Sequence, residues 1–264
     1  MHNQTRYRLL LALCVLAAAC DLDVGGRQVR AVSLHLATAV LAVGLVLRIR
    51  LYAKTPAPLK IPTTPAPVTQ GGVILRMFRE VVFFESLFKS TKWTWIFGWM
   101  FHMGLFAELA RHSRYFNSWM PAELVGPLKY AGFAMVIGLF GLLARRLFVD
   151  RVRYITSPSD IAMLILLILI GLSGIMMTFV WHTDVTAVTH YFRSVIWPFG
   201  GIPELPGDPV LWIHLLLVVA LMIVFPISKL LHAPGVFFSP SRNMVDNPRE
   251  QRHVVDWAKK LEQN

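Results

Sequence analysis

The chain has 264 residues, of which 55% are apolar and 16% charged, with 8 Trp and 17 Phe. This composition lies outside the soluble globular range and indicates an integral membrane protein. Its two cysteines, Cys14 and Cys20, are too few for an iron–sulfur cluster, which needs about four ligands. A C-x-x-C-H attachment motif is also missing from the sequence, so any haem would be of the b type.

Apolar runs that approach the roughly 20 residues needed to cross a bilayer begin after a short N-terminal run. That first run, Leu9–Ala19, follows two arginines and is interpreted as a short span, with a cleaved signal peptide as the alternative. The longer runs are 31–50, 94–112, 126–147, 160–181 and 210–231. The predicted fold is an all-α polytopic transmembrane helix bundle with six spans, or five if the N-terminal segment is a cleaved signal.

The net charge of +11 has an uneven distribution along the chain. Most of the 26 Lys and Arg residues fall in the segments that six spans would place on one side, namely 1–8, 48–92, 145–158 and 229–264. The positive-inside rule therefore predicts cytoplasmic N- and C-termini. The basic residues are expected to set topology and to contact membrane lipid, and no nucleic-acid partner is expected.

The predicted spans are joined by segments with their own patterns. Five prolines in Pro56–Pro67 favour an extended cytoplasmic linker, and the apolar side of Gly72–Phe88 predicts a helix at the inner membrane face or packed on its neighbours. The predicted domains are a two-span segment (1–53), the linker and interfacial helix (54–92), a four-helix core (93–232) and a cytoplasmic tail (233–264).

Short motifs in the sequence add detail to the predicted fold. Ser157 to Asp160 have the chemistry of a helix start, and the small residues Gly171, Ser173 and Gly174 would let helices or a cofactor approach closely, with helix packing favoured. The loop His182–Pro209 is long enough to cap a site, and Val254–Leu261 could form a short helix in the tail.

Two apolar runs each carry a pair of histidines. His102 and His112 are separated by roughly 15 Å along a helix, and His214 and His232 project on the same side about 27 Å apart if that helix is straight. Pro226 makes a kink expected. In an antiparallel arrangement His102 meets His232 at the inner level and His112 meets His214 at the outer level. Each pair can clamp one haem iron through two axial imidazoles, which favours electron transfer.

Two other roles compete with haem ligation at these histidines. A single intramembrane histidine is usually a core residue satisfied by a neighbour, and a mono- or dinuclear metal site fits poorly because Glu108 is the one acid near the four. The remaining histidines are expected to be surface or packing residues: His2, His35, His182, His190 and His253.

The stretch from Trp93 to His232 resembles the haem-binding gamma subunit of respiratory nitrate reductase. The motifs that carry the likeness are the histidine spacings, Arg145–Phe148, Asp160-Ile161, and Phe225–His232. The resemblance implies two b haems held by the same four histidines, and a quinone (menaquinone or ubiquinone) at the outer end. Candidate quinone contacts are Arg114, Tyr115 and Lys129, beside His112. The family's lysine aligns with Val125, and Lys129 is only nearby.

The tail from Ser239 to His253 resembles that of the DsrM family, the membrane cytochrome b subunits of the DsrMKJOP complex. This resemblance implies electron exchange between the quinone pool and a cytoplasmic iron–sulfur subunit, DsrK-like, in dissimilatory sulfur metabolism. Other membrane and periplasmic subunits of a DsrMKJOP-like complex are implied as partners, in the bacterial cytoplasmic (inner) membrane. Alternatives are the gamma subunit of a nitrate reductase-like complex and a non-redox membrane anchor; a transporter would show internal repeats.

Overall fold

The computed structural model describes residues 27–55, 61–196, 203–247 and 261, and within these ranges the chain forms helices and no strand. The predicted first span, Leu9–Ala19, lies outside them, and so does the predicted tail helix except for Leu261. The chain divides into two compact units. Unit 1 comprises residues 1–41 and 92–224, and unit 2 comprises residues 42–91 and 225–264.

Four helical segments of the described chain are long and apolar enough to cross a membrane: Ser33–Lys54, Ala122–Phe148, Pro158–Trp181 and Pro209–Ile227. They confirm that four of the predicted apolar runs form helices of sufficient length to span a membrane. The run 94–112 also forms a helix, α5 (Lys92–His112), but it is not one of the four. Two charged residues, Glu108 and Arg111, and two histidines interrupt its apolar sequence. The count of six spans and the orientation of the termini stay predictions.

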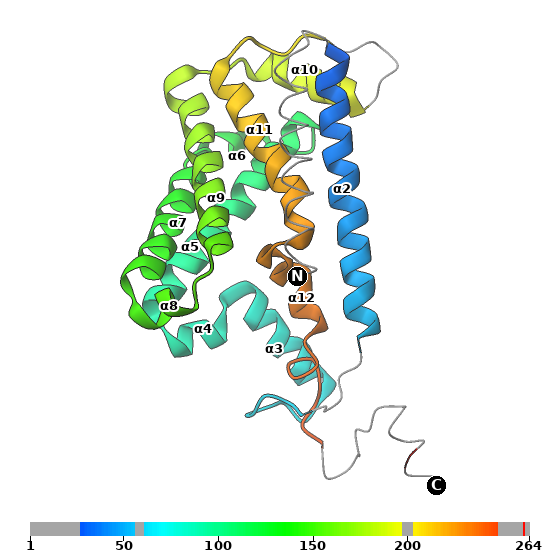
Figure 1. Cartoon of the computed structure of the whole chain (residues 1–264), viewed down its shortest axis with the longest axis vertical. Helices are drawn as coiled ribbons and strands as arrows, with labels where there is room; N and C mark the ends of the chain where they lie inside the picture. Colours follow the sequence, from blue (N-terminus) through cyan, green and yellow to red (C-terminus); the bar gives the residue numbers. More distant parts are fainter. Residues whose placement is uncertain (1–26, 56–60, 197–202, 248–260, 262–264) are drawn as a thin grey trace. The chain divides into compact units, whose positions relative to one another are not determined.

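Four helices form the body of unit 1: α5, α7 (Ala131–Phe148), α9 (Pro158–Met176) and α11 (Pro209–Val224). Successive members pack on one another, α5 on α7, α7 on α9 and α9 on α11 (Figure 1). Glycines allow the first of these contacts. A Cβ added at Gly138 would lie 2.7 Å from the backbone nitrogen of Phe101, and one at Gly104 would lie 2.7 Å from that of Met135. Such close backbone approach is typical of membrane helix pairs.

The outward sides of these helices are apolar. Large side chains with about half of their surface exposed occur on every one of them, including Phe106, Ile137, Leu169 and Ile213. A soluble protein rarely exposes so much contiguous apolar surface. The bundle therefore has the surface expected of helices that face lipid.

One end of unit 1 is covered by the long loop that follows α9. The loop contains α10 (Val185–Ile196), whose Val188, Tyr191 and Phe192 form a buried cluster with Leu211 at the start of α11. Phe192 also contacts Phe116, with ring centroids 5.5 Å apart, just after the short helix η1 (Ser113–Tyr115). The shorter α6 (Ala122–Leu128) precedes α7. The loop thus packs against the segment that follows His112.

The start of α9 confirms the predicted helix cap. Ser157 and Asp160 form a capping box, in which each side chain pairs with the other residue's backbone N–H. Asp160 also lies 3.4 Å from the Arg146 guanidinium, and the short α8 (Asp150–Ile155) joins α7 to α9. At its other end α9 continues as one turn of π-helix, η2 (Met177–Trp181).

The helix carrying His214 is shorter than the sequence predicts. α11 ends at Val224, because Pro226 cannot continue the backbone hydrogen-bond ladder, and two 3₁₀ turns follow, η4 (Phe225–Ile227) and η5 (Lys229–Leu231). His232 then begins α12 (His232–Gly235), followed by η6 (Val236–Phe238). The expectation of one kinked helix from His214 to His232 is therefore corrected to a helix that stops between them.

Unit 2 holds the end of α2 (Arg27–Lys54), the linker, and two helices where one was predicted. The expected helix over Gly72–Phe88 is divided into α3 (Gln70–Phe83) and α4 (Glu85–Ser90). Phe84 separates them in the left-handed backbone region, with φ of 52°. Along α3, Val73 is buried while Ile74 and Phe78 are exposed, so one apolar side of this helix faces outward. Its location at the membrane face stays a prediction.

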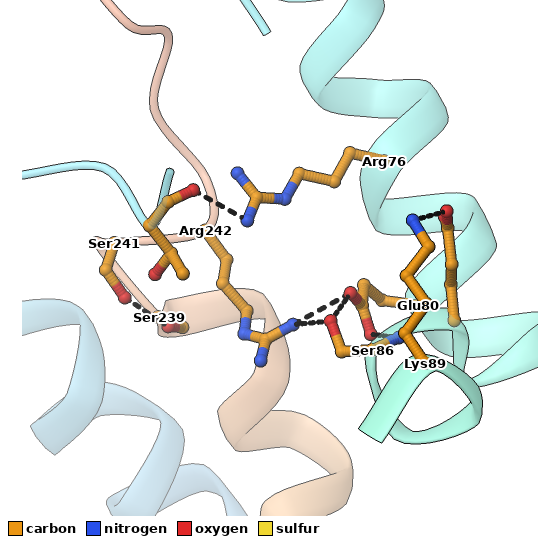
Figure 2. Close-up of polar contacts among 9 residues, drawn as sticks. Arg76, Glu80, Ser86, Lys89, Ser239, Ser241 and Arg242 are labelled. Carbon is orange, nitrogen blue, oxygen red and sulfur yellow. Dashed lines mark hydrogen bonds and ion pairs between the residues drawn. The ribbon is translucent and has the colours of Figure 1, made fainter. Parts of the chain in front are cut away.

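A polar network joins the C-terminal segment of unit 2 to α3 and α4 (Figure 2). The Arg242 guanidinium lies 2.9 Å from the Glu80 carboxylate and donates to the Ser86 hydroxyl, which in turn donates to Glu80. Backbone bonds from Thr63 to Ser241 and from Asp246 to Pro67 tie the linker to the same segment. The segment after η6 is thus a packed part of unit 2 up to Asn247.

Candidate functional site

The structure brings two of the four predicted histidines together within unit 1. His112 is the last residue of α5, and His214 lies buried in the second turn of α11. Their ring centroids are 6.4 Å apart, and the ring planes differ by 19°. The outer pair predicted from spacing is therefore a spatial pair.

Each ring is held through its Nδ1 atom. Nδ1 of His112 lies 2.7 Å from the Glu108 carbonyl oxygen, so it donates, and its proton must be on Nδ1. Nδ1 of His214 lies 2.9 Å from Oγ of Ser173 on α9. That hydroxyl can donate its single proton to the carbonyl of Leu169 or Ile170, which favours a bond in which it accepts from the imidazole. Both histidines then carry a lone pair on Nε2.

This donor set fits a haem iron with two axial imidazoles. With metal–nitrogen bonds of about 2 Å, and each ring centre about 1 Å behind its coordinating nitrogen, such rings stand roughly 6 Å apart. The observed centroid separation of 6.4 Å agrees. Among the described residues no group of three or more His, Cys, Asp or Glu could hold a metal ion, whereas a haem needs only two axial ligands from the protein.

A buried ion pair stands beside His112. Nε of Arg111 donates to the Glu108 carboxylate at 3.0 Å, and the two side chains are only 9% and 13% exposed. The same carboxylate lies 3.7 Å from Nδ1 of His112. Arg111 is thus neutralised inside the bundle, and the negative charge of Glu108 is near the imidazole but balanced by a cation.

Two of the three predicted quinone contacts lie next to His112. The ring of Tyr115 packs edge-on against its imidazole, with centroids 5.5 Å apart. Arg114 donates from Nη2 to the Tyr115 hydroxyl at 3.1 Å, and its Nε is buried without a hydrogen-bond partner among the described residues. A buried guanidinium N–H of this kind is a donor that a ligand oxygen could satisfy.

The third, Lys129, has different neighbours. Its ammonium group lies over the rings of Tyr130 at 5.1 Å and Phe179 at 5.6 Å, where the π-helical turn η2 places Phe179. Phe133 packs against the same Phe179 ring, with centroids 5.0 Å apart. Lys129 therefore belongs to an aromatic cluster rather than to the group formed by His112, Arg114 and Tyr115.

The other two predicted ligands belong to different units of the chain. His102, in α5 of unit 1, places Nδ1 2.7 Å from the Gly98 carbonyl oxygen. His232, in unit 2, places Nδ1 2.9 Å from the Lys229 carbonyl oxygen. Each therefore carries its proton on Nδ1 and its lone pair on Nε2, as coordination requires. Their pairing stays a prediction.

Two features of the site have no clear signal in the sequence. Ser173 was assigned to helix packing, and its bond to His214 joins residues 41 positions apart. The Glu108–Arg111 pair has the three-residue spacing of helix neighbours, but its burial depends on how α5 packs. The i,i+3 spacing of opposite charges in an apolar run is the one clue the sequence offered.

A bundle of apolar helices with two neighbouring histidines in it is the arrangement expected of a membrane cytochrome b subunit. The family model described as the nitrate reductase gamma subunit matches residues 85–253. The chain therefore belongs to the nitrate reductase gamma subunit family.

Individual relatives point to two complexes. The chain is 34% identical over 269 residues to the Hdr-like menaquinol oxidoreductase cytochrome b-like subunit of Archaeoglobus fulgidus, with 84% of this chain and 81% of that protein covered. The corresponding subunit of Archaeoglobus profundus is 28% identical with similar coverage, 84% and 80%. The respiratory nitrate reductase 1 gamma chain of Escherichia coli is 31% identical, covering 50% of this chain and 68% of its own length.

Proposed function

We propose that the chain is a membrane dihaem cytochrome b that exchanges electrons between the quinone pool and a cytoplasmic iron–sulfur subunit, in the manner of DsrM. The observation that carries the proposal is the His112–His214 pair, with centroids 6.4 Å apart and both Nδ1 atoms hydrogen-bonded. In this arrangement both Nε2 lone pairs are available to one iron.

When bound, the two haems would supply one-electron redox chemistry. The chain's residues supply position. His112 and His214 would hold one group and His102 and His232 the other, each from an imidazole whose Nδ1 atom is hydrogen-bonded. Lys229 takes part through its carbonyl oxygen, which orients His232. His214 is buried, whereas the His112 side chain is 39% exposed and His232 is exposed.

The quinone would bind beside His112, where Arg114 offers a buried N–H and Tyr115 a hydroxyl. A quinone carbonyl oxygen can accept a hydrogen bond from Nε of Arg114 and so satisfy that donor. Lys129 is a weaker member of this site because its ammonium group already lies over two aromatic rings. The quinone is proposed to be menaquinone or ubiquinone.

The proposed setting is dissimilatory sulfur metabolism, in a DsrMKJOP-like complex of the bacterial cytoplasmic membrane. The tail from Ser239 to His253 supports it through its likeness to DsrM. The coverage of the relatives also favours a menaquinol oxidoreductase over a nitrate reductase, since the former matches 84% of the chain and the latter 50%. Six spans with both termini in the cytoplasm are proposed with it, and the basic inner segments would contact lipid and a DsrK-like subunit.

Histidine variants test the proposal. The haem content of the purified protein is measured by difference spectra in His112→Ala, His214→Ala and, as a matched control, His182→Ala. His182 is exposed, with Nδ1 against the Val180 carbonyl. Each of the first two variants should lose one haem, and the control should keep both. Wild-type haem content in folded His112→Ala and His214→Ala would contradict the proposal, and a haem-free wild type would favour a non-redox anchor.

The partner is tested by tagging the chain in its native membrane and identifying the subunits that co-purify. An iron–sulfur subunit of the DsrK type is expected. Recovery of a nitrate reductase catalytic subunit in its place would favour the nitrate reductase alternative.

A further inference from the structure

The Nδ1 atom of His214 is within hydrogen-bond distance of a side chain of another helix. His102, His112 and His232 pair with carbonyl oxygens three or four residues earlier in the chain. His214 instead pairs with Oγ of Ser173, 2.9 Å away on α9. The orientation of this imidazole is therefore set by the packing of α9 against α11.

Both members of this bond are buried. Ser173 and His214 are each 8% exposed, and α9 lies close beside the ring, since a Cβ added at Gly174 would be 3.7 Å from His214 Cε1. Water has little access to replace the serine if it is removed. The Ile170 carbonyl, which also hydrogen-bonds this imidazole, would then be the remaining acceptor, and because it lies in a different direction from the serine oxygen the ring would turn or bind less well.

The surroundings of this bond favour the serine as its acceptor. A hydroxyl has one proton, and the carbonyl oxygens of Leu169 at 2.8 Å and Ile170 at 2.9 Å are both within reach of the Ser173 hydroxyl as acceptors for it. The Ile170 carbonyl also hydrogen-bonds the His214 imidazole, and a carbonyl oxygen can only accept. Both contacts favour the tautomer with the proton on Nδ1, which leaves Nε2 as the coordinating atom.

We propose that Ser173 is a positioning residue for the outer haem site, which fixes the tautomer and ring direction of His214 and raises the basicity of this ligand. The inference rests on the proposed function, in which His214 is an axial ligand. An acceptor on the distal N–H of a coordinating histidine makes the imidazole a stronger donor, which stabilises the oxidised metal. Loss of the serine oxygen should therefore raise the reduction potential of that haem.

The test is a redox titration of haem absorbance in the purified, detergent-solubilised protein. Ser173→Ala removes the acceptor, Ser173→Thr retains a hydroxyl at the same place, and Thr178→Val is the matched control. The Thr178 hydroxyl, like that of Ser173, donates to a carbonyl oxygen four residues earlier, that of Gly174 at 2.9 Å. Thr178 makes no hydrogen bond to any of the four histidines among the described contacts. Ser173→Cys, whose sulfur is a weaker acceptor, provides a second variant of similar size should Ser173→Ala fail to fold.

In Ser173→Ala the reduction potential of one of the two haems should rise by about 59 mV. This corresponds to a tenfold change in the equilibrium constant of a one-electron reduction. Ser173→Cys should shift it less in the same direction, while Ser173→Thr and Thr178→Val should match the wild type. A purely structural serine would lower haem content or thermal stability in Ser173→Ala and Ser173→Cys and leave the potential of the retained haem unchanged, which would overturn the inference.

The haem content of the wild type distinguishes a failure of the Ser173 inference from a failure of the proposed function. Two haems in the wild type with no shift in the serine variants would contradict the role of Ser173 and leave the proposed function standing. A wild type without haem would contradict both.

Discussion

The imidazole rings of His112 and His214, which stand on two different helices, have centroids 6.4 Å apart and planes 19° from parallel. Their anchors differ in kind. Glu108 holds His112 from within the same helix, whereas Ser173 holds His214 from a neighbouring one. The geometry of the pair consequently depends on the packing of α5, α9 and α11 as well as on the two histidines.

The close contact of α5 and α7 should be sensitive to a single methyl group. In Gly138→Ala the new Cβ would meet the backbone of Phe97 and Phe101 at 2.7 Å, so the helices must separate. Overpacking of this kind costs about 1–3 kcal/mol, and the variant should lower the thermal unfolding midpoint of the detergent-solubilised protein. Gly126→Ala is the control, since nothing lies within 4 Å of its added Cβ. Equal midpoints for the two variants would contradict the packing described.

The Glu108–Arg111 pair should show strong coupling. Glu108→Gln leaves the guanidinium of Arg111 buried without its charged partner, and removal of one member of a buried pair costs about 3–5 kcal/mol. The double variant Glu108→Gln/Arg111→Gln removes both charges and should recover much of that loss. Thermal unfolding of Glu108→Gln, Arg111→Gln and the double variant measures the coupling, and strictly additive losses would show that the charges do not interact.

The polar network of unit 2 should protect the C-terminal segment from proteases. Arg242→Ala removes the contacts with Glu80 and Ser86, so limited proteolysis should cut the segment after η6 faster than in the wild type. Lys89→Ala is the control, because its pair with Glu85 leaves the lysine side chain 70% exposed and such surface pairs contribute little. Equal cleavage of both variants would contradict a docked segment.

Loss of the helix cap at the start of α9 should lower the stability by less than loss of one member of the buried ion pair. Ser157→Ala removes the side-chain oxygen that accepts from the N3 backbone N–H, at an expected cost of about 0.5–2 kcal/mol. The lost stability should be measurable by thermal unfolding. Ser194→Ala is a control within α10, because its hydroxyl only donates back to the His190 carbonyl. A loss no greater than in the control would count against the cap.

Features with local causes could be predicted from the sequence. Apolar runs of sufficient length located four spans, and Ser157 with Asp160 marked the start of α9, because hydropathy and capping are decided within a few residues. The facing of His112 and His214 was predicted because helical spacing and antiparallel packing leave few other pairings.

Features decided by tertiary packing could not be predicted. Phe84 adopts a left-handed conformation between α3 and α4 that its residue type does not favour. Pro226 predicted a kink, but the helix stops at Val224. The bond between Ser173 and His214 depends on two helices that meet only in the folded chain, and no spacing in the sequence encodes it.

The proposed function depends on four histidines of this chain holding two b haems. This is measured by a reduced-minus-oxidised spectrum of the purified wild-type protein, combined with haem extraction and quantification per chain. We expect b-type absorption and two haems per chain, one for each histidine pair. Fewer than two haems in a folded, fully loaded preparation would contradict it.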